Sequence, residues 1–444
     1  MNIALGIVGI FASFGLMVFL TMKNFSTLYV TIIVSIVVMI TNGLPITSTL
    51  VSVYMPGVAS FVGSFYAIMV AGAIMGKIYD KSGAATSISR WLVRNMLRGS
   101  DQMSDDKRTA LTVLVIMIAG MLLTFGGINN VVLLLTMYPL AVGACKEANI
   151  PQRFAIGIAC CGTNTFADVA PFSPQTPNLA AMTALGTPSN AAMIPGIVGA
   201  LVEMVTIIWV FTIVVRKARA RGEVFSYGPN DTAFTENADL PNPILSLLPL
   251  LFIFVSFNFL KLHISLAVAG GVIISLILFW KQLKLQGVLD VVNSGAETST
   301  TALLLISSVV GFGSVVAATE SYQILIGTLM GMSIHPYLQL MICMFVFALV
   351  AGSPTAALKM ALPTLGPAFI SQGYAAGAIH RISAFASTVT DSLPCSGGVV
   401  LGVALSGRTM KEAYPGIFIS TSLAALTGTV AVALVSFLFP ALAV

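Results

Sequence analysis

The sequence predicts an all-α polytopic membrane protein with roughly 10–12 spanning segments, arranged as two inverted-topology repeats with broken helices. Composition is the first reason, because 57% of the 444 residues are hydrophobic and only 8% are charged. A soluble domain carries about 25% charged residues. The second reason is that apolar stretches of about 20 residues recur, which is the length that crosses a hydrocarbon core of about 30 Å. The third is that both halves share one order of stretches and one polar motif.

Regular apolar stretches are interpreted as spanning helices. They lie near 3–21, 27–43, 57–76, 109–125, 193–215, 243–260, 265–280, 300–318, 336–351 and 415–438. Other apolar stretches are broken by Gly, Pro and small polar residues, and these lie at 126–144, 154–190, 352–371 and 378–406. Lipid cannot satisfy the backbone groups that such breaks free. We therefore expect the broken stretches to be buried in protein or to line a watery cavity.

Basic residues are concentrated in three connectors, 77–108, 216–221 and 281–284. The positive-inside rule places these loops in the cytoplasm, and counting spans back from them places Met1 outside. Within the first connector, residues 84–98 predict an amphipathic helix on the inner membrane surface. We therefore expect a multi-pass protein of the cell (inner) membrane, with the lipid bilayer around it.

The polar connector 218–242 is interpreted as a cytoplasmic linker between a first repeat, 1–217, and a second repeat, 243–444. Motifs correspond across it: "LLTFGGINN" with "LVAGSPTAA", and Thr165, Asp168 and Pro171 with Thr388, Asp391 and Pro394. The stretch 57–76 must run toward a basic loop, whereas its counterpart 300–318 runs away from one, so the repeats are inverted. Inverted repeats with paired breaks are typical of secondary transporters, which bind substrate where the breaks meet.

The residues around these breaks carry a family resemblance. The stretches "TFGGINNVVLLLTMYPLAVGACKEANIPQR", "AGSPTAALKMALPTLGPAF" and "IHRISAFASTVTDSLPCSGGVV" resemble the gluconate permease (GntP-type) family. The resemblance implies a proton-coupled symporter of organic acids within the wider ion-transporter superfamily. It also implies a scaffold, a moving transport domain with two re-entrant hairpins, and a homodimer. On that division, residues 1–108 and 243–318 are scaffold, 109–215 and 336–406 are transport-type segments, and 415–438 is the last span.

Three carboxyl groups lie in apolar context and are candidates for proton coupling. Asp168 and Asp391 occupy matched places in the two repeats, and a carboxylate at such depth costs about 2.5–3.5 kcal/mol on insertion scales unless it is paired, hydrated or functional. The alternative for each aspartate is that it caps a helix close to a proline. Glu203 is a candidate proton relay, and the alternative is a packed, protonated side chain.

The two Gly-rich breaks are the candidate substrate site. A half-helix that starts at a break directs backbone N–H groups and the positive end of its dipole into the protein, which suits a carboxylate. The alternative is a helix kink that binds no ligand. The candidate binding residues are Gly127, Asn129 and Asn130 at the first break, Ser353 and Thr355 at the second, and Thr163, Asn164, Thr165, Thr388 and Ser392 beside the aspartates. Gln175, Thr176 and Asn178 either line the site or satisfy backbone groups.

Lys359 follows the second break, where the family usually has a small or apolar residue. It could hold an anionic substrate, lie near Asp391 as a fixed cation in place of sodium, or extend its stem to the membrane interface. Arg381 is expected to anchor a lipid headgroup or a helix end.

Other classes of protein fit the sequence less well. It contains no HExxH, Gly-x-Ser-x-Gly or Walker A motif, so we expect neither an enzyme nor an ATP-driven pump. The net charge of +5 is explained by membrane topology and predicts no nucleic-acid partner. We expect no cofactor and no metal site, with H⁺ as the coupling ion and Na⁺ as the alternative. The sequence thus predicts proton-coupled symport of a hydroxy-monocarboxylate or a sugar acid such as gluconate by an alternating-access, elevator-type mechanism. The remaining alternatives are a sodium-coupled carboxylate symporter and a cation/proton exchanger.

Overall fold

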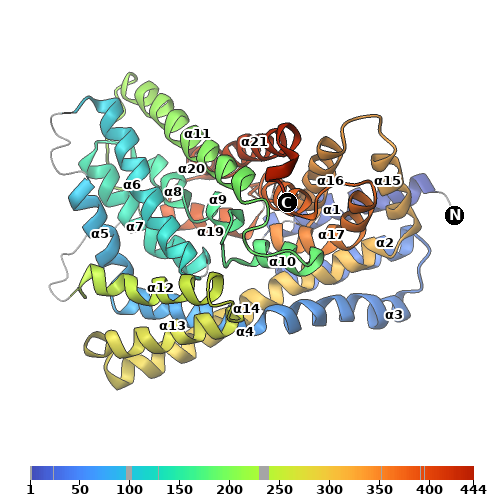
Figure 1. Ribbon diagram of the computed structural model, residues 1–444, viewed down its shortest axis with the longest axis horizontal. Helices are drawn as coiled ribbons and strands as arrows, with labels where there is room; N and C mark the ends of the chain where they lie inside the picture. The colour runs from blue at the N-terminus through green and yellow to red at the C-terminus, as the bar shows by residue number, and fades with distance from the viewer. Residues whose placement is uncertain are drawn as a thin grey trace.

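The computed structural model describes residues 3–23, 25–96, 103–128, 130–229, 240–351, 353–390, 392–394 and 396–444. All regular structure in this part of the chain is helical (Figure 1). Among the same residues, six helices are long and apolar enough to cross a membrane, and four shorter apolar helices accompany them. The predicted class, an all-α polytopic membrane protein, is confirmed.

The helices of the two halves follow one another in the same order. The first half contains α1 (Ile3–Met22), α2 (Thr27–Thr41), α3 (Ile46–Thr49), α4 (Met55–Lys81), α5 (Ala84–Met96), α6 (Asp105–Phe125), α7 (Asn130–Glu147), α8 (Ala155–Cys160), α9 (Phe166–Val169), α10 (Thr176–Leu185) and α11 (Met193–Arg219). The second contains α12 (Pro243–Asn258), α13 (Ile264–Leu278), α14 (Trp280–Ala317), α15 (Glu320–Met330), α16 (Pro336–Ala351), α17 (Pro354–Ser371), α18 (Ala376–Ser387), α19 (Gly397–Ser406), α20 (Met410–Phe418) and α21 (Ala424–Leu438). A π-helical segment joins α3 to α4, and another joins α20 to α21.

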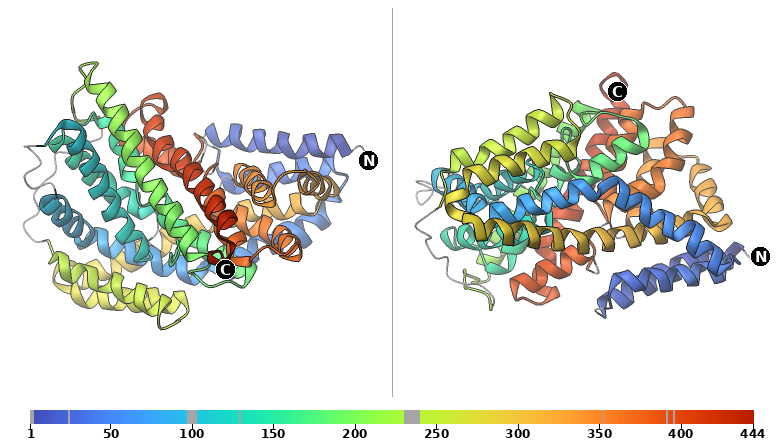
Figure 2. Two further views of the ribbon diagram at one scale, coloured as in Figure 1. Left: turned by 45° about the horizontal axis from the view of Figure 1, so that its top comes forward. Right: turned by 90° about the horizontal axis from the view of Figure 1, so that it is seen from below.

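The long helices α4 and α14 lie side by side and antiparallel (Figure 2). Small residues allow the close approach, as is usual for membrane helices. A Cβ placed on Gly57 would lie 3.2 Å from Gly311 Cα, and one on Gly295 would lie 2.9 Å from Ile74 Cα. The cross-contacts between the halves are also reciprocal, since α2 packs on α14 as α13 packs on α4, and α1 on α15 as α12 on α5. This pattern is what two oppositely oriented repeats produce.

The segments α6–α7 and α16–α17 are hairpins that return to the end where they begin. Arg108, near the start of α6, donates to the carbonyl of Glu147 at the end of α7. Tyr337 at the start of α16 stacks 5.2 Å from Tyr374, which follows α17. Each arm after its break is a continuous helix, so the irregularity expected throughout 126–144 and 352–371 is confined to the break. Prolines inside membrane helices are tolerated when neighbouring groups satisfy the freed carbonyl.

The two hairpins open at opposite ends of the molecule. The open end of α6–α7 lies at the C-terminus of α11, where Arg219 donates to Ala148 O at 2.6 Å. The open end of α16–α17 lies at the C-terminus of α21, where Phe437 stacks 4.8 Å from His335. Because α11 and α21 are antiparallel neighbours, with the Thr206 and Thr427 hydroxyls 3.0 Å apart, their C-termini point in opposite directions.

Charged contacts gather at the open end of the first hairpin. Arg153 pairs with Glu223 at 2.8 Å, and Arg216 pairs with Asp106 at 3.2 Å. Helix α5 lies beside this end as an amphipathic helix, but its apolar face packs on α4, α6 and α12 instead of on lipid. Ile88 on that face is fully buried, while Arg94 on the other face is exposed.

Candidate substrate and coupling site

The tips of the two hairpins are linked through the start of α10. The Gln175 side-chain amide donates to Thr124 O at 2.8 Å and to Ile128 O at 3.1 Å, both at the tip of α6–α7. The next residue, Thr176, places its hydroxyl 2.9 Å from that of Thr355, in the first turn of α17. Helix ends leave carbonyl and N–H groups without partners in the helix. Gln175 therefore satisfies carbonyl groups at the tip of α6–α7, and Thr176 contacts the tip of α16–α17.

Each tip turns through a few residues. At the first, Gly127 is buried with φ +76°, a conformation that glycine adopts without strain, and its carbonyl faces Gly72 of α4. Asn129 lies outside the described residues, and α7 begins at Asn130. At the second tip, Ser353 is the N-cap of α17, and its hydroxyl accepts from Ala356 N at 3.5 Å. The helices α7 and α17 thus both begin at the tips, which is the arrangement that the two breaks predicted.

The threonines beside Asp168 bond mainly to local backbone. The hydroxyl of Thr163 donates to Ala159 O of the preceding helix α8 at 3.3 Å, and that of Thr388, the C-cap residue of α18 in the second half, donates to Phe385 O at 2.8 Å. The Thr165 hydroxyl accepts from Gly162 N at 3.1 Å. Such local bonds are common for threonine next to a turn. In this conformation these hydroxyls therefore satisfy backbone groups at the turns that follow α8 and α18. Two further candidates beside the aspartates differ: Asn164 is half-buried, and Ser392 is buried.

Asp168 is buried in the short helix α9, which lies among α6, α10, α11 and α18. Thr165 occupies the N-cap position of α9, and Gln175 occupies that of α10. Asp168 is therefore not the N-cap residue of either helix. Asp391, its counterpart in the sequence, lies outside the described residues.

Glu203 is fully buried between α11 and α21. A Cβ placed on Gly428 of α21 would lie 2.9 Å from the Glu203 carboxyl carbon, so only glycine fits opposite it. Among the described residues the backbone N–H of Phe166 and the side chain of Asp168 are the groups close enough to act on this carboxyl group. An ionised carboxylate is costly in such surroundings.

Arg381 was expected to anchor a lipid headgroup or a helix end, and its contacts fit the second alternative, since Val169 ends α9 and Ala191 directly precedes the N-cap of α11. Its side chain is fully buried in α18 and donates only to groups of the first half. The acceptors are Val169 O, Asn178 Oδ1 at 3.1 Å, Ser189 O at 3.1 Å, and Ala191 O at 3.1 Å from Nε and 2.8 Å from Nη2. The adjacent His380 also contacts Asn178 Oδ1, at 2.9 Å. A guanidinium has five N–H groups, and each of them has an acceptor among these residues. The sequence signal was a His-Arg pair flanked by small and apolar residues.

Lys359 contacts the long helix α4. Its ammonium donates to the Ser64 hydroxyl at 2.8 Å and lies 4.6 Å from the ring centre of Phe65 and 5.5 Å from that of Phe61. Ser64 lies near the middle of the 36-residue helical run Ile46–Lys81. About 25 Å of helix therefore separates this contact from either end of the run. This contact with the middle of a long apolar helix favours the alternatives in which Lys359 acts inside the protein over the one in which it extends to the membrane interface.

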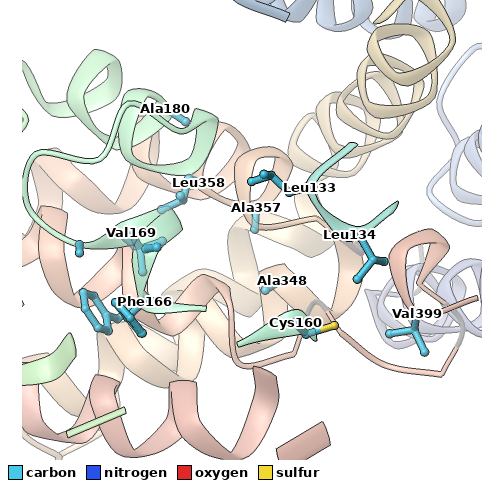
Figure 3. Packing of buried hydrophobic residues seen from close by; sticks show 14 of the residues in the cluster. Leu133, Leu134, Cys160, Phe166, Val169, Ala180, Ala348, Ala357, Leu358 and Val399 are labelled. Atoms are coloured by element: carbon cyan, nitrogen blue, oxygen red, sulfur yellow. The ribbon is translucent and has the colours of Figure 1, made fainter. Parts of the chain in front are cut away.

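Around these polar groups the segments of both halves pack tightly. Figure 3 shows buried apolar side chains from α7, α8, α9, α10, α16, α17 and α19 at this place. Thus the arms of both hairpins and the broken segments enclose one common region.

Helical repeats of opposite orientation, each with a hairpin whose tip is joined to the other through a third segment, are typical of a multi-pass secondary transporter. The chain matches the model of the GntP family permeases over residues 5–261. Since this is more than half of its length, the protein belongs to the GntP permease family, as its motifs predicted.

Two further comparisons extend over most of the chain. The chain is 25% identical to an uncharacterized transporter, YxjC, of Bacillus subtilis (strain 168), over 93% of this chain and 95% of that protein. Its fold is similar to the crystal structure of the YdaH transporter of Alcanivorax borkumensis, with a TM-score of 0.54 over 88% of each chain and 15% identity. At that identity the likeness concerns the fold alone.

Proposed function

We propose that this protein is a proton-coupled symporter of a small organic acid anion, a hydroxy-monocarboxylate or a sugar acid such as gluconate. One observation carries the proposal: the tips of two hairpins that open at opposite ends are joined through Gln175 and Thr176 at the start of α10, and the short helix α9 before it holds the buried Asp168. A site reached from opposite sides through mirror-related elements suits alternating access.

The anionic substrate is supported by the helix ends at the tips. N-terminal N–H groups and helix dipoles favour negative charge, and both α7 and α17 begin there. The half-buried Asn164 and Ser353 are suited to hold hydroxyl or carboxylate oxygens. Lys359, one helical turn after Thr355, adds a positive charge.

Proton coupling is supported by the burial of the carboxyl groups. A proton lets a carboxyl group lose its charge while it stays out of water, and this suits a group that moves through the protein during transport. We assign this role to Asp168, Asp391 and Glu203. In the elevator-type cycle that we propose, the segments 109–215 and 336–406 move together against a scaffold formed by 1–108 and 243–318. The dimer would form in the inner membrane, with the basic ends in the cytoplasm.

Uptake by proteoliposomes tests the proposal. An inward proton gradient should drive accumulation of radiolabelled gluconate or of another acid from a panel, and collapsing the gradient should abolish it. Glu203→Gln and Asp391→Asn should lose gradient-driven accumulation and retain exchange of internal for external acid. Accumulation that needs Na⁺ in place of the proton gradient would identify a sodium symporter. Proton release on addition of Na⁺ or K⁺, with no acid transported, would identify a cation/proton exchanger.

A further inference from the structure

Among the residues that the structure describes, the contacts of the Lys359 ammonium are all with neutral groups. Its contacts are the Ser64 hydroxyl and the faces of Phe65 and Phe61. Ser64 itself donates to Ser60 O at 2.7 Å, so its oxygen is oriented to accept from the lysine. None of the ion pairs among the described residues includes Lys359. Placing a charged lysine among apolar helices costs free energy, and no carboxylate among the described residues offsets that cost. Lys359 is therefore a candidate functional group.

The same lysine lies one helical turn from the place where the hairpin tips meet. Thr355 and Lys359 are four residues apart in α17, so their side chains share one face of the helix. Side chains of a helix lean toward its N-terminus, and the N-terminus of α17 is the tip. The flexible stem of Lys359 therefore allows its ammonium to reach either α4 or the region in front of Thr355.

A carboxylate in that region is a stronger partner than the one Lys359 now has. An ammonium and a carboxylate attract each other as two full opposite charges, whereas the Ser64 hydroxyl offers the ammonium only a dipole. The contact with Phe65 and Phe61 is a cation–π interaction, which is weaker than an ion pair in the same low-dielectric surroundings. An ammonium that donates to a substrate carboxylate gives up its place against Ser64, Phe61 and Phe65.

We propose that the Lys359 ammonium leaves its contacts on α4 and binds the carboxylate of the substrate. We call this change of partner the lysine exchange. Substrate binding thereby releases the second hairpin from the long helix α4. This inference rests on the proposed function, because it requires an anionic substrate at the hairpin tips. It assigns Ser64, Phe61 and Phe65 a specific role: they form a competing site for the ammonium. Binding of the substrate and release of the second hairpin from α4 then both result from a single movement of the Lys359 side chain.

The test is a set of binding measurements on the purified full-length protein, using as probe the acid that wild type accumulates in proteoliposomes. Ser64→Ala and Phe65→Leu weaken the competing site, so each should tighten binding of the acid by about 2- to 10-fold. Ser60→Ala is the matched control, because its hydroxyl donates to Gly57 O and does not contact Lys359. Lys359→Met should bind the acid more weakly, and Ser64→Ala should have no further effect in that background.

The outcomes separate this inference from the proposed function. If wild type accumulates no acid, the proposed function fails, and the inference fails with it. If wild type accumulates an acid but Ser64→Ala and Phe65→Leu bind it unchanged or more weakly, the lysine exchange is refuted. The proposed symport function is then unaffected. Should Lys359→Met fail to fold, the tightening in the two α4 variants, which both keep the lysine, still decides the question.

Discussion

Replacing Arg381 should destabilise the protein far more than replacing an arginine at the surface. In Arg381→Met the carbonyls of Val169 and Ala191 lose the side chain that donates to them. Ser189 O keeps the Phe172 N–H at 3.0 Å, and Asn178 Oδ1 keeps His380. Two buried acceptors without partners cost about 1–3 kcal/mol each, so about 2–6 kcal/mol in total.

That loss is a large part of the roughly 5–15 kcal/mol that stabilises a typical native protein. Thermal unfolding of the purified protein in detergent measures it. Arg381→Lys should lie between wild type and Arg381→Met, because an ammonium has three donors in place of five. The control is Arg216→Met, whose side chain is 61% exposed and pairs with Asp106, and it should cost no more than about 1 kcal/mol. Equal unfolding temperatures for Arg381→Met and Arg216→Met would refute the reasoning.

Two further predictions concern contacts between the halves. A Cβ on Gly157 would lie 2.7 Å from Gly416 Cα, whereas one on Gly416 would have no neighbour nearer than 3.6 Å. Gly157→Ala should therefore lower the unfolding temperature or the yield of folded protein, at a cost of about 1–3 kcal/mol, and Gly416→Ala should not; similar behaviour of the two would contradict the packing. Thr355→Val should leave the Thr176 hydroxyl without its partner and cost about 1 kcal/mol, and adding Thr176→Val should recover part of that cost. A double-mutant cycle on thermal unfolding measures the coupling, and strict additivity would argue against the bond.

The sequence predicted the spanning helices and the pairing of the halves well, because lipid constrains length and composition directly. The family resemblance implied two re-entrant hairpins, but the residues alone did not predict that α7 and α17 are continuous helices after their breaks. Hydropathy records how apolar a segment is and not its direction after a break, and an 18-residue helix such as α7 or α17 has the length of a span.

The candidate site was predictable at the level of segments and less so at the level of side chains. The breaks do lie together, but Thr163 and Thr388 bond to the helices that precede them. Arg381 and Lys359 were harder still, because their partners are remote in sequence: Val169 lies 212 positions from the arginine and Ser64 lies 295 from the lysine. Rules for basic residues near membranes use the expected depth of a residue and the sequence around it. Neither of these quantities gives information about a partner that is remote in the sequence.

The amide of Gln175 has a consequence for how the protein can open. It joins the carbonyls of Thr124 and Ile128 to the segment that leads into α10, and the neighbouring Thr176 extends the connection to the opposite hairpin. A tip held in this way cannot swing aside as an independent gate without breaking buried hydrogen bonds. This connection therefore supports the part of the proposed cycle in which both tips travel as a single body, with the bound molecule carried between them.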